Sequence, residues 1–139
     1  MKNKVATCIT PTTDTKIKFE ENNRKILFLN PKRVEYKKVQ VDGCILTDGI
    51  RCDNLLLSVD EHEERYVELK GVDVIHAIDQ LEETIVKLGE YDDCRHSYVI
   101  STNVAPAYTT KIQLKQLYFK RKYNSELIIR EKQLEVALY

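Results

Sequence analysis

The sequence contains no tryptophan, only four glycines and only three prolines in 139 residues. Flexible linkers and low-complexity tracts are rich in glycine, proline or serine, so this scarcity argues against both. No internal repeat is visible either. A chain of this length can bury about two thirds of its unfolded surface in one core. We therefore expect a single domain over residues 1–139, with turns separating its elements.

Neither sign of charge is in excess, because 22 lysines and arginines balance 22 aspartates and glutamates. Attraction to nucleic acid must therefore come from a local patch of the surface. Long apolar runs are missing as well. The N-terminal segment lacks the apolar run of about 7 to 15 residues of a signal peptide, and no stretch approaches the ~20 apolar residues of a membrane span. These absences predict a soluble, cytoplasmic protein that does not engage membranes.

Cysteine is scarce and widely spaced. The four cysteines are Cys8, Cys44, Cys52 and Cys94. They form no C-x-x-C pair of the kind that binds zinc or exchanges disulfides, and nothing else in the sequence indicates secretion. We interpret all four as reduced thiols.

The first third of the chain is rich in strand-forming residues. Segments 16–20, 25–29 and 33–41 alternate or cluster β-formers and are separated by the turn-forming sequences ENN and NPK. They predict a β-meander. Gly43 and Gly49 each follow an aspartate and divide residues 39–59 into a strand, a short strand and a second strand.

Helical periodicity begins near residue 72. Apolar side chains then recur every three or four residues up to Leu88, and Gly89 stands where a helix cap belongs. We expect a helix over 72–88, a buried strand over 97–102, a loop over 103–110 and a second helix over 110–123. Residues 126–130 and 133–139 are close enough to form a hairpin. The fold class is α/β, or α+β if the meander dominates: a mixed sheet with flanking helices, preceded by a meander and ending in a hairpin.

Charged residues surround the most apolar strand of the chain. Asp53 precedes the run NLLLSV, and the next strand ends in Glu68-Leu69-Lys70. Strand alternation places Glu68 and Lys70 on one face. An even-numbered loop between the two strands puts Asp53 on that face too. With residues 60–63 as the loop, Asp53 stands opposite Lys70, whereas an odd-numbered loop puts it on the other face unless a bulge intervenes.

An aspartate at the head of a strand, a hairpin, the sequence VELKG and then a helix bearing Gln80 resemble the core of the PD-(D/E)XK nuclease superfamily, whose fold is restriction-endonuclease-like. The resemblance covers roughly residues 42–102. It implies that Asp53 and Glu68 bind Mg²⁺ or Mn²⁺, that Lys70 positions the attacking water and that Gln80 assists. The proline that precedes the motif aspartate in the family is Cys52 here, and an additional N-terminal acid is not evident, although Glu20, Glu21 or Asp42 are candidates.

Physical chemistry supports that assignment. Mg²⁺ takes oxygen ligands and keeps several waters, so two carboxylates can hold it and leave positions for phosphate and water. The triplet E-x-K alone is not specific, because about 1.4 copies are expected by chance from 13 glutamates and 15 lysines, and two occur. The second, Glu35-Tyr36-Lys37, has no aspartate-headed strand before it and no helix after it, which makes it an internal control.

A basic segment follows in the second predicted helix. Its cations are Lys111, Lys115, Lys120, Arg121 and Lys122. They are candidate contacts for nucleic-acid phosphates, with interleaved tyrosine and phenylalanine rings available to stack on bases. The alternative is that the lysines are only solvated while Ile112, Leu114, Leu117 and Tyr118 pack on the sheet.

The leading hypothesis is therefore a metal-dependent nuclease that hydrolyses phosphodiester bonds of DNA or RNA through a metal-activated water. Its main competitor is a catalytically inactive nuclease-like fold that serves as a protein-binding, immunity or defence-associated module. A separate alternative for Glu68 and Lys70 is a surface ion pair on the solvated face of an edge strand. A homodimer formed through the C-terminal strands is compatible with either function.

Overall fold

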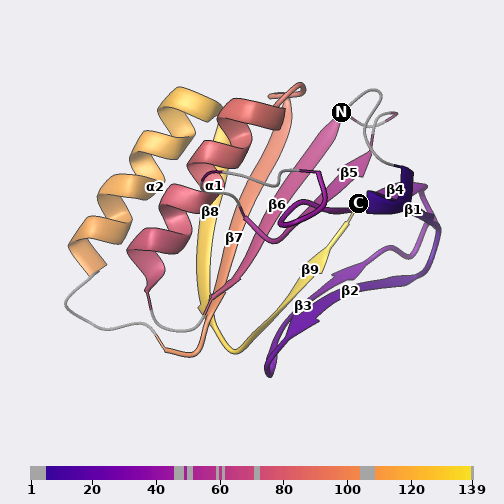
Figure 1. Cartoon of the computed structure of the whole chain (residues 1–139), viewed down its shortest axis with the longest axis horizontal. Coiled ribbons are helices and arrows are strands. Elements are labelled where there is room, and N and C mark those ends of the chain that lie inside the picture. The colour runs from indigo at the N-terminus through magenta and orange to yellow at the C-terminus, as the bar shows by residue number, and fades with distance from the viewer. Residues whose placement is uncertain are drawn as a thin grey trace.

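Two helices and two β-sheets make up the computed structural model of the chain (Figure 1). The structure describes residues 6–45, 49, 52–58, 60, 62–70, 73–103 and 109–138, without the side chains of Ala6 and Lys70. The six-stranded sheet has the order β1 (Ile9–Thr12), β4 (Tyr36–Gln40), β5 (Asn54–Ser58), β6 (Glu63–Lys70), β7 (Cys94–Ser101) and β8 (Ser125–Glu131). The three-stranded sheet has the order β2 (Lys16–Glu21), β3 (Arg24–Leu29) and β9 (Gln133–Ala137).

The larger sheet is mixed. Strands β1, β4, β5 and β6 pair antiparallel, whereas β6, β7 and β8 pair parallel. The two parallel crossovers contain α1 (Val74–Leu88) and α2 (Thr109–Tyr123), and a short 3-10 turn (Ala6–Cys8) precedes β1. The predicted mixed sheet with flanking helices is confirmed, and its class is α+β.

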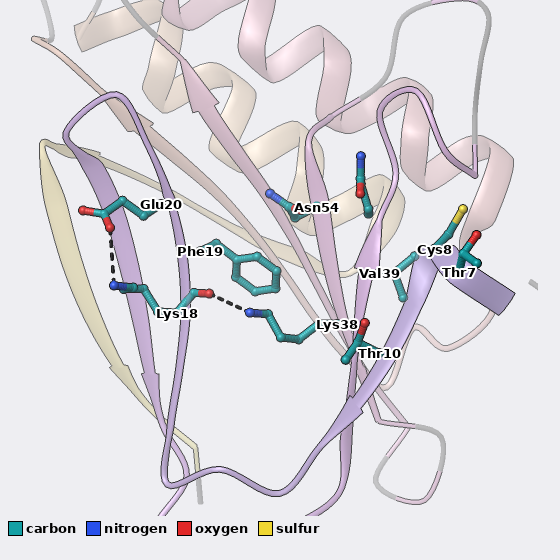
Figure 2. Close-up of a pocket in the computed structure, with 10 residues that line it drawn as sticks. Thr7, Cys8, Thr10, Lys18, Phe19, Glu20, Lys38, Val39 and Asn54 are labelled. Carbon is teal, nitrogen blue, oxygen red and sulfur yellow. Dashed lines mark hydrogen bonds and ion pairs between the residues drawn. The ribbon is translucent and has the colours of Figure 1, made fainter. Parts of the chain in front are cut away.

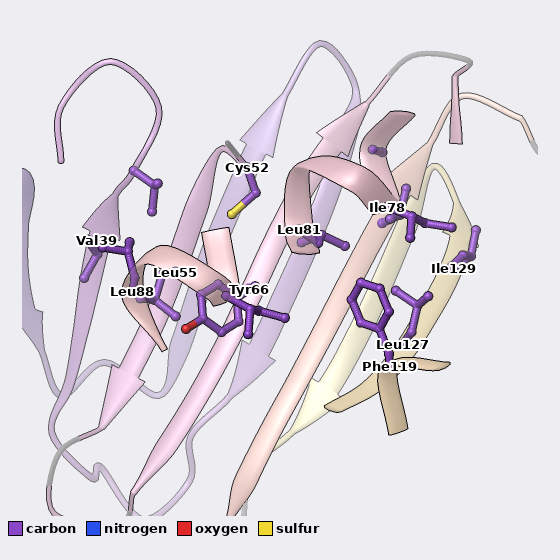
Figure 3. Close-up of a cluster of buried hydrophobic side chains, with 14 of the residues drawn as sticks. Val39, Cys52, Leu55, Tyr66, Ile78, Leu81, Leu88, Phe119, Leu127 and Ile129 are labelled. Carbon is purple, nitrogen blue, oxygen red and sulfur yellow. The ribbon is translucent and has the colours of Figure 1, made fainter. Parts of the chain in front are cut away.

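Both faces of the larger sheet are covered. On one face Leu55, Tyr66 and Ile129 pack against α1 and α2, as Figure 3 shows. On the other face Leu56, Val67 and Tyr98 pack against the three-stranded sheet. Consecutive strand residues thus enter different cores, which explains why the central strands are apolar without strict alternation.

The predicted helices form close to their expected limits. Asp73 caps α1, since its carboxylate accepts the main-chain N–H of His76 at 2.9 Å, and the N–H of Gly89 donates to the carbonyl of Ile85 at 2.8 Å. Helix α2 begins one residue earlier than expected. Within the described ranges, neither helix has the length and apolar character that a membrane crossing requires.

The predicted meander divides between the two sheets. Strands β2 and β3 form a hairpin whose turn residues Asn22 and Asn23 both have positive φ, as the sequence ENN indicated. Strand β4 belongs to the other sheet. The short strand expected after Gly43 does not form over 43–45, and residues 46–48 lie outside the described residues, as do 104–108 of the predicted loop.

The expected C-terminal hairpin is wrong. β8 and β9 are separated only by Lys132, yet β8 pairs with β7 and β9 pairs parallel with β3. Lys132 connects the sheets, because its N–H donates to the carbonyl of Ser101 and its carbonyl accepts the N–H of Lys25. Its φ of 65° lets the chain change direction within one residue.

Two cysteines are not reduced, which corrects the sequence interpretation. Cys8 and Cys44 form a disulfide with a Cα–Cα distance of 5.7 Å. They are 36 positions apart in the chain but are brought together because β1 pairs with β4. Cys52 and Cys94 are free thiols, as expected.

Candidate metal centre

The register of β5 and β6 decides whether the candidate carboxylates meet. Ser58 pairs with Glu63 and Asn54 with Val67, so the connecting loop, residues 59–62, has an even number of residues. Continued by one residue, this register places Asp53 opposite Glu68, not opposite Lys70 as the example loop of 60–63 implied. Asp53 and Glu68 therefore lie on one face of the sheet, as an even loop implies. The pairing of β5 with β6 is shifted by two residues relative to the pairing that a loop of 60–63 would give.

Hydrogen bonds hold the two carboxylates at the strand end. The main-chain N–H of Asp53 donates to Glu68 Oε1 at 3.0 Å, and the N–H of Leu69 donates to Asp53 Oδ2 at 2.9 Å. Glu68 is 2% exposed and Asp53 is half-buried. Because both side chains are anchored to the main chain, their positions relative to each other are fixed by the hairpin.

A second set of hydrogen bonds connects the start of β5 to α1. The N–H of Cys52 donates to Thr84 Oγ1 at 2.8 Å, and the Thr84 hydroxyl donates to the carbonyl of Gln80 at 2.8 Å. Burial raises the pKa of the Cys52 thiol far above its usual range, and the negative charges of Glu68 and Asp53 raise it further. The thiol is therefore protonated at neutral pH and is not an activated nucleophile.

Lys70 and Gln80 complete the predicted set. Lys70 is the last residue of β6, two positions after Glu68, and its side chain lies outside the described part of the structure. Gln80 is half-buried near the middle of α1. The main-chain carbonyl of Gln80 accepts a hydrogen bond from the Thr84 hydroxyl, and Thr84 Oγ1 accepts the N–H of Cys52. Gln80 therefore lies one helical turn before the residue of α1 that contacts Cys52.

No third acidic side chain among the described residues joins Asp53 and Glu68 in a group that could hold a metal ion. Asp42 lies closest along the main chain, since its N–H donates to the carbonyl of Asp53 at 3.3 Å, but its side chain is exposed. Glu20 and Glu21 belong to β2, in the sheet on the opposite face. Among the described residues, no three histidine, cysteine, aspartate or glutamate side chains form a group that could hold a metal ion.

The donor set nevertheless fits a hard divalent cation. Asp53 and Glu68 offer only oxygen atoms, and Mg²⁺ commonly binds through one or two carboxylates while keeping several waters. A carboxylate oxygen that accepts one hydrogen bond keeps a second lone pair for a cation. The softer and larger ligand sets that zinc prefers are not present in the described part of this site.

The predicted nucleic-acid contacts divide between the two ends of α2. Parallel β6, β7 and β8 end near Glu68, and α2 runs back toward their starts, as Figure 1 shows. Lys111 and Lys115 lie in the first half of α2. Lys120, Arg121 and Lys122 precede Ser125, which aligns with Arg95 at the start of β7. The second group is therefore about 13 to 16 Å farther along the helix than Lys111, given a rise of 1.5 Å per residue.

The packing expected for α2 is only partly correct. Ile112 and Phe119 are buried, but Leu114, Leu117 and Tyr118 are exposed instead of packing on the sheet. Acidic residues at the start of β6 are buried as well: Glu63, which the example loop of 60–63 included, and Glu64 both belong to this strand. Sequence alone carried no signal for either outcome, because both depend on which elements become neighbours.

A polar recess of about 340 Å³ lies between β2 and the β1–β4 edge (Figure 2). The Lys38 amine enters it, donates to the carbonyl of Lys18 at 2.9 Å and stands 4.9 Å from the centre of the Phe19 ring. Asn54 lines the recess and follows Asp53 directly. Since adjacent strand residues face opposite sides, this recess is separate from the carboxylate pair.

No protein-family model, curated protein or solved structure matches the chain.

Proposed function

We propose that the chain is a divalent-cation-dependent phosphodiesterase that acts on nucleic acid in the manner of PD-(D/E)XK nucleases. The observation that carries the proposal is the placement of Asp53 opposite Glu68 at the end of the hairpin, with both carboxylates anchored to main-chain N–H groups. An ordinary surface ion pair does not account for it, because Glu68 is almost completely buried.

Each residue of the site would have a distinct role in phosphodiester hydrolysis. Asp53 and Glu68 would bind the cation, which supplies Lewis-acid activation of a phosphodiester and of water. Lys70, two residues farther along β6, would orient the attacking water and offset negative charge that develops on the phosphate. Gln80 would support the site from α1. Lys111 and Lys115 are the basic residues of α2 nearest the strand ends and would contact the substrate backbone.

Thermal and chemical unfolding with Mg²⁺, Mn²⁺ or EDTA tests the metal site. A cation that binds only the folded chain adds about 2.7 kcal/mol to the free energy of unfolding at 100 times its Kd. Asp53→Asn should abolish this gain, since it removes a negative charge but keeps an oxygen to accept the Leu69 N–H. Glu35→Gln, at the exposed glutamate of the control triplet, should leave the gain intact.

The same proteins then test turnover on single-stranded and duplex DNA and RNA. Lys70→Ala should remove cleavage without removing metal-dependent stabilisation, while Lys37→Ala in the control triplet should cleave normally. Cleavage that persists in Lys70→Ala at the unmutated rate would contradict the assigned role. Absence of metal stabilisation in the unmutated chain, with and without a nucleic-acid substrate, would refute the metal centre.

The second candidate function is a nuclease-like binding module without turnover. It is favoured by one observation, the lack of a third acidic side chain beside Asp53 and Glu68 among the described residues. It predicts that Asp53→Asn leaves every binding property of the protein unchanged.

A further inference from the structure

The exposed apolar surface of the protein is concentrated on its helices. Among the described residues, the exposed large hydrophobic side chains are Val86 (64%), Leu114 (64%), Leu117 (46%) and Tyr118 (37%). The first belongs to α1 and the others to α2. Single exposed leucines are common on soluble proteins, but their restriction to one layer marks a contact surface.

Two of these side chains, Leu114 and Tyr118, line a groove between the helices. Its volume is about 370 Å³, and its lining residues are Ile75, Glu82, Lys111, Leu114, Lys115 and Tyr118. Leu114, Leu117 and Tyr118 follow the spacing i, i+3 and i+4, and Arg121 continues it at i+7. A helix thus presents an apolar stripe to solvent, although the opposite side of α2 already packs on the sheet through Ile112 and Phe119.

Charge distinguishes this surface from the rest of the molecule. Helix α2 carries five cations and no acidic residue, whereas the whole chain has a formal charge of zero. Lys115 lies 3.8 Å from Asp79 and the Lys122 amine donates to the Tyr118 hydroxyl at 3.0 Å. In the part of the chain that the structure describes, no ion pair joins Lys111, Lys120 or Arg121 to a carboxylate. The groove is therefore apolar at its centre and cationic along α2.

We propose that this groove binds an acidic amphipathic helix of a partner protein. Apolar side chains of the partner would cover Leu114, Leu117 and Tyr118, and its carboxylates would pair with the cations of α2. Tyrosine and arginine are the side chains that most often dominate the energy of such contacts, and both occur in this stripe. The inference does not depend on the metal centre.

Other occupants account for fewer of these features. A second copy of the chain would place one α2, with five positive charges, against another. Nucleic acid would satisfy the cations and stack on Tyr118 but would leave Leu114 and Leu117 exposed to water. A protein helix with acidic and apolar faces matches both the charge and the leucines.

Fluorescence anisotropy with a synthetic helical peptide tests the proposal. The peptide carries leucines at i, i+3, i+4 and i+7 and glutamates elsewhere, and a scrambled peptide of the same composition is its control. We expect the full chain to bind the amphipathic peptide at least about tenfold more tightly than the scrambled one. Leu114→Ser and Lys111→Glu should each weaken binding by about tenfold or more, a typical effect at a central contact. Lys32→Glu, in the exposed turn before β4, is the matched control and should bind normally.

Three results would overturn the proposal. The first is absence of peptide binding up to about 100 μM, a limit that still detects weak complexes. The second is equal binding of the scrambled peptide. The third is peptide binding that does not change in Leu114→Ser while single-stranded DNA, RNA or anionic phospholipid vesicles displace the peptide. Asp53→Asn should bind the peptide normally, which separates this test from that of the metal centre.

Discussion

At the scale of single residues, the most heavily bonded side chain is Glu64. Its Oε1 accepts from the Tyr66 hydroxyl and from Arg95 Nε, each at 2.9 Å, and its Oε2 accepts the N–H groups of Glu90 and Tyr91 at 2.7 and 2.8 Å. Glu64 is 2% exposed, and its bonds with Tyr66 and Arg95 are buried, whereas those from Glu90 and Tyr91 are partly buried. Arg95 also donates to the carbonyl of Tyr123 at 2.9 Å. One carboxylate thus joins β6, the turn after α1 and the end of α2.

Glu64→Gln should destabilise the protein strongly. The amide keeps the shape of the side chain but brings an NH₂ group toward donors and leaves the buried Arg95 without its charge partner. Breaking a buried pair in this way costs about 3 to 5 kcal/mol of unfolding free energy. Urea unfolding measures this loss, and Glu83→Gln on the exposed side of α1 should change it by less than about 0.5 kcal/mol. A small effect of Glu64→Gln would show that water reaches the network.

Sequence reasoning at this scale located the candidate carboxylates but not their register. Strand alternation and the even loop were sufficient to place Asp53 and Glu68 on one face. Which residue stands opposite Asp53 depends on the turn at 59–62, and a run of charged residues fits several turns equally well. Glu64 was missed because the local sequence does not distinguish a buried glutamate from a solvated one. Its burial depends on Arg95, which becomes its neighbour only in the folded structure.

At the scale of elements, the open side of β8 is protected by side chains. Gln116 Nε2 donates to the carbonyl of Leu127 at 3.0 Å, and the Arg130 guanidinium donates to the carbonyl of Ile129 at 2.9 Å. These carbonyls are two residues apart and therefore point the same way, toward the free edge of the sheet. Edge strands invite pairing with other chains, and side-chain caps of this kind reduce that tendency.

Replacing both Gln116 and Arg130 by alanine should increase self-association, since two main-chain acceptors at the sheet edge become available to another strand. Light scattering and size-exclusion chromatography over a concentration series would detect it. Gln113→Ala, on an exposed position of α2, is the control. An unchanged oligomeric state in the double variant would mean that the caps do not restrain pairing through β8.

Element prediction succeeded where the pattern is local. Helix α1 followed from its apolar period and from Gly89 at its end, because both signals are local in sequence, whereas its N-cap Asp73 was placed inside the expected helix. The C-terminal hairpin failed because adjacent strands usually pair, but Lys132 carries the chain from one sheet to the other. For α2, the alternative in which Leu114 and Leu117 pack on the sheet rested on hydrophobicity alone, and Ile112 and Phe119 are the residues that reach the core.

At the scale of the whole molecule, the disulfide between Cys8 and Cys44 encloses β1 to β4, including the hairpin of the smaller sheet. The bond closes a loop of 36 positions and so lowers the conformational entropy of the unfolded chain. This effect adds about 3 to 4 kcal/mol to the free energy of unfolding. It is also the one feature of the structure typical of proteins that fold in oxidising surroundings.

Reduction with dithiothreitol should therefore lower the free energy of unfolding by about 3 to 4 kcal/mol, and Cys8→Ser with Cys44→Ser should reproduce the loss. Urea unfolding of the unmutated chain with and without reductant measures the difference. The Cys94→Ser variant keeps the disulfide and should respond to reductant like the unmutated chain. If the reductant has no effect, the bond contributes nothing to stability.

The parallel pairing of β3 with β9 has a consequence for synthesis on the ribosome. β3 ends at Leu29 and acquires its second neighbour only when β9, Gln133–Ala137, has been made. At roughly 5 to 20 residues per second, that interval is about 5 to 20 s. Throughout it, one side of β3 has no strand to pair with and the core around Ile26 and Phe28 lacks Leu134, Val136 and Leu138. Nascent chains are therefore exposed to aggregation and to chaperone binding along this early strand until β9 has been made.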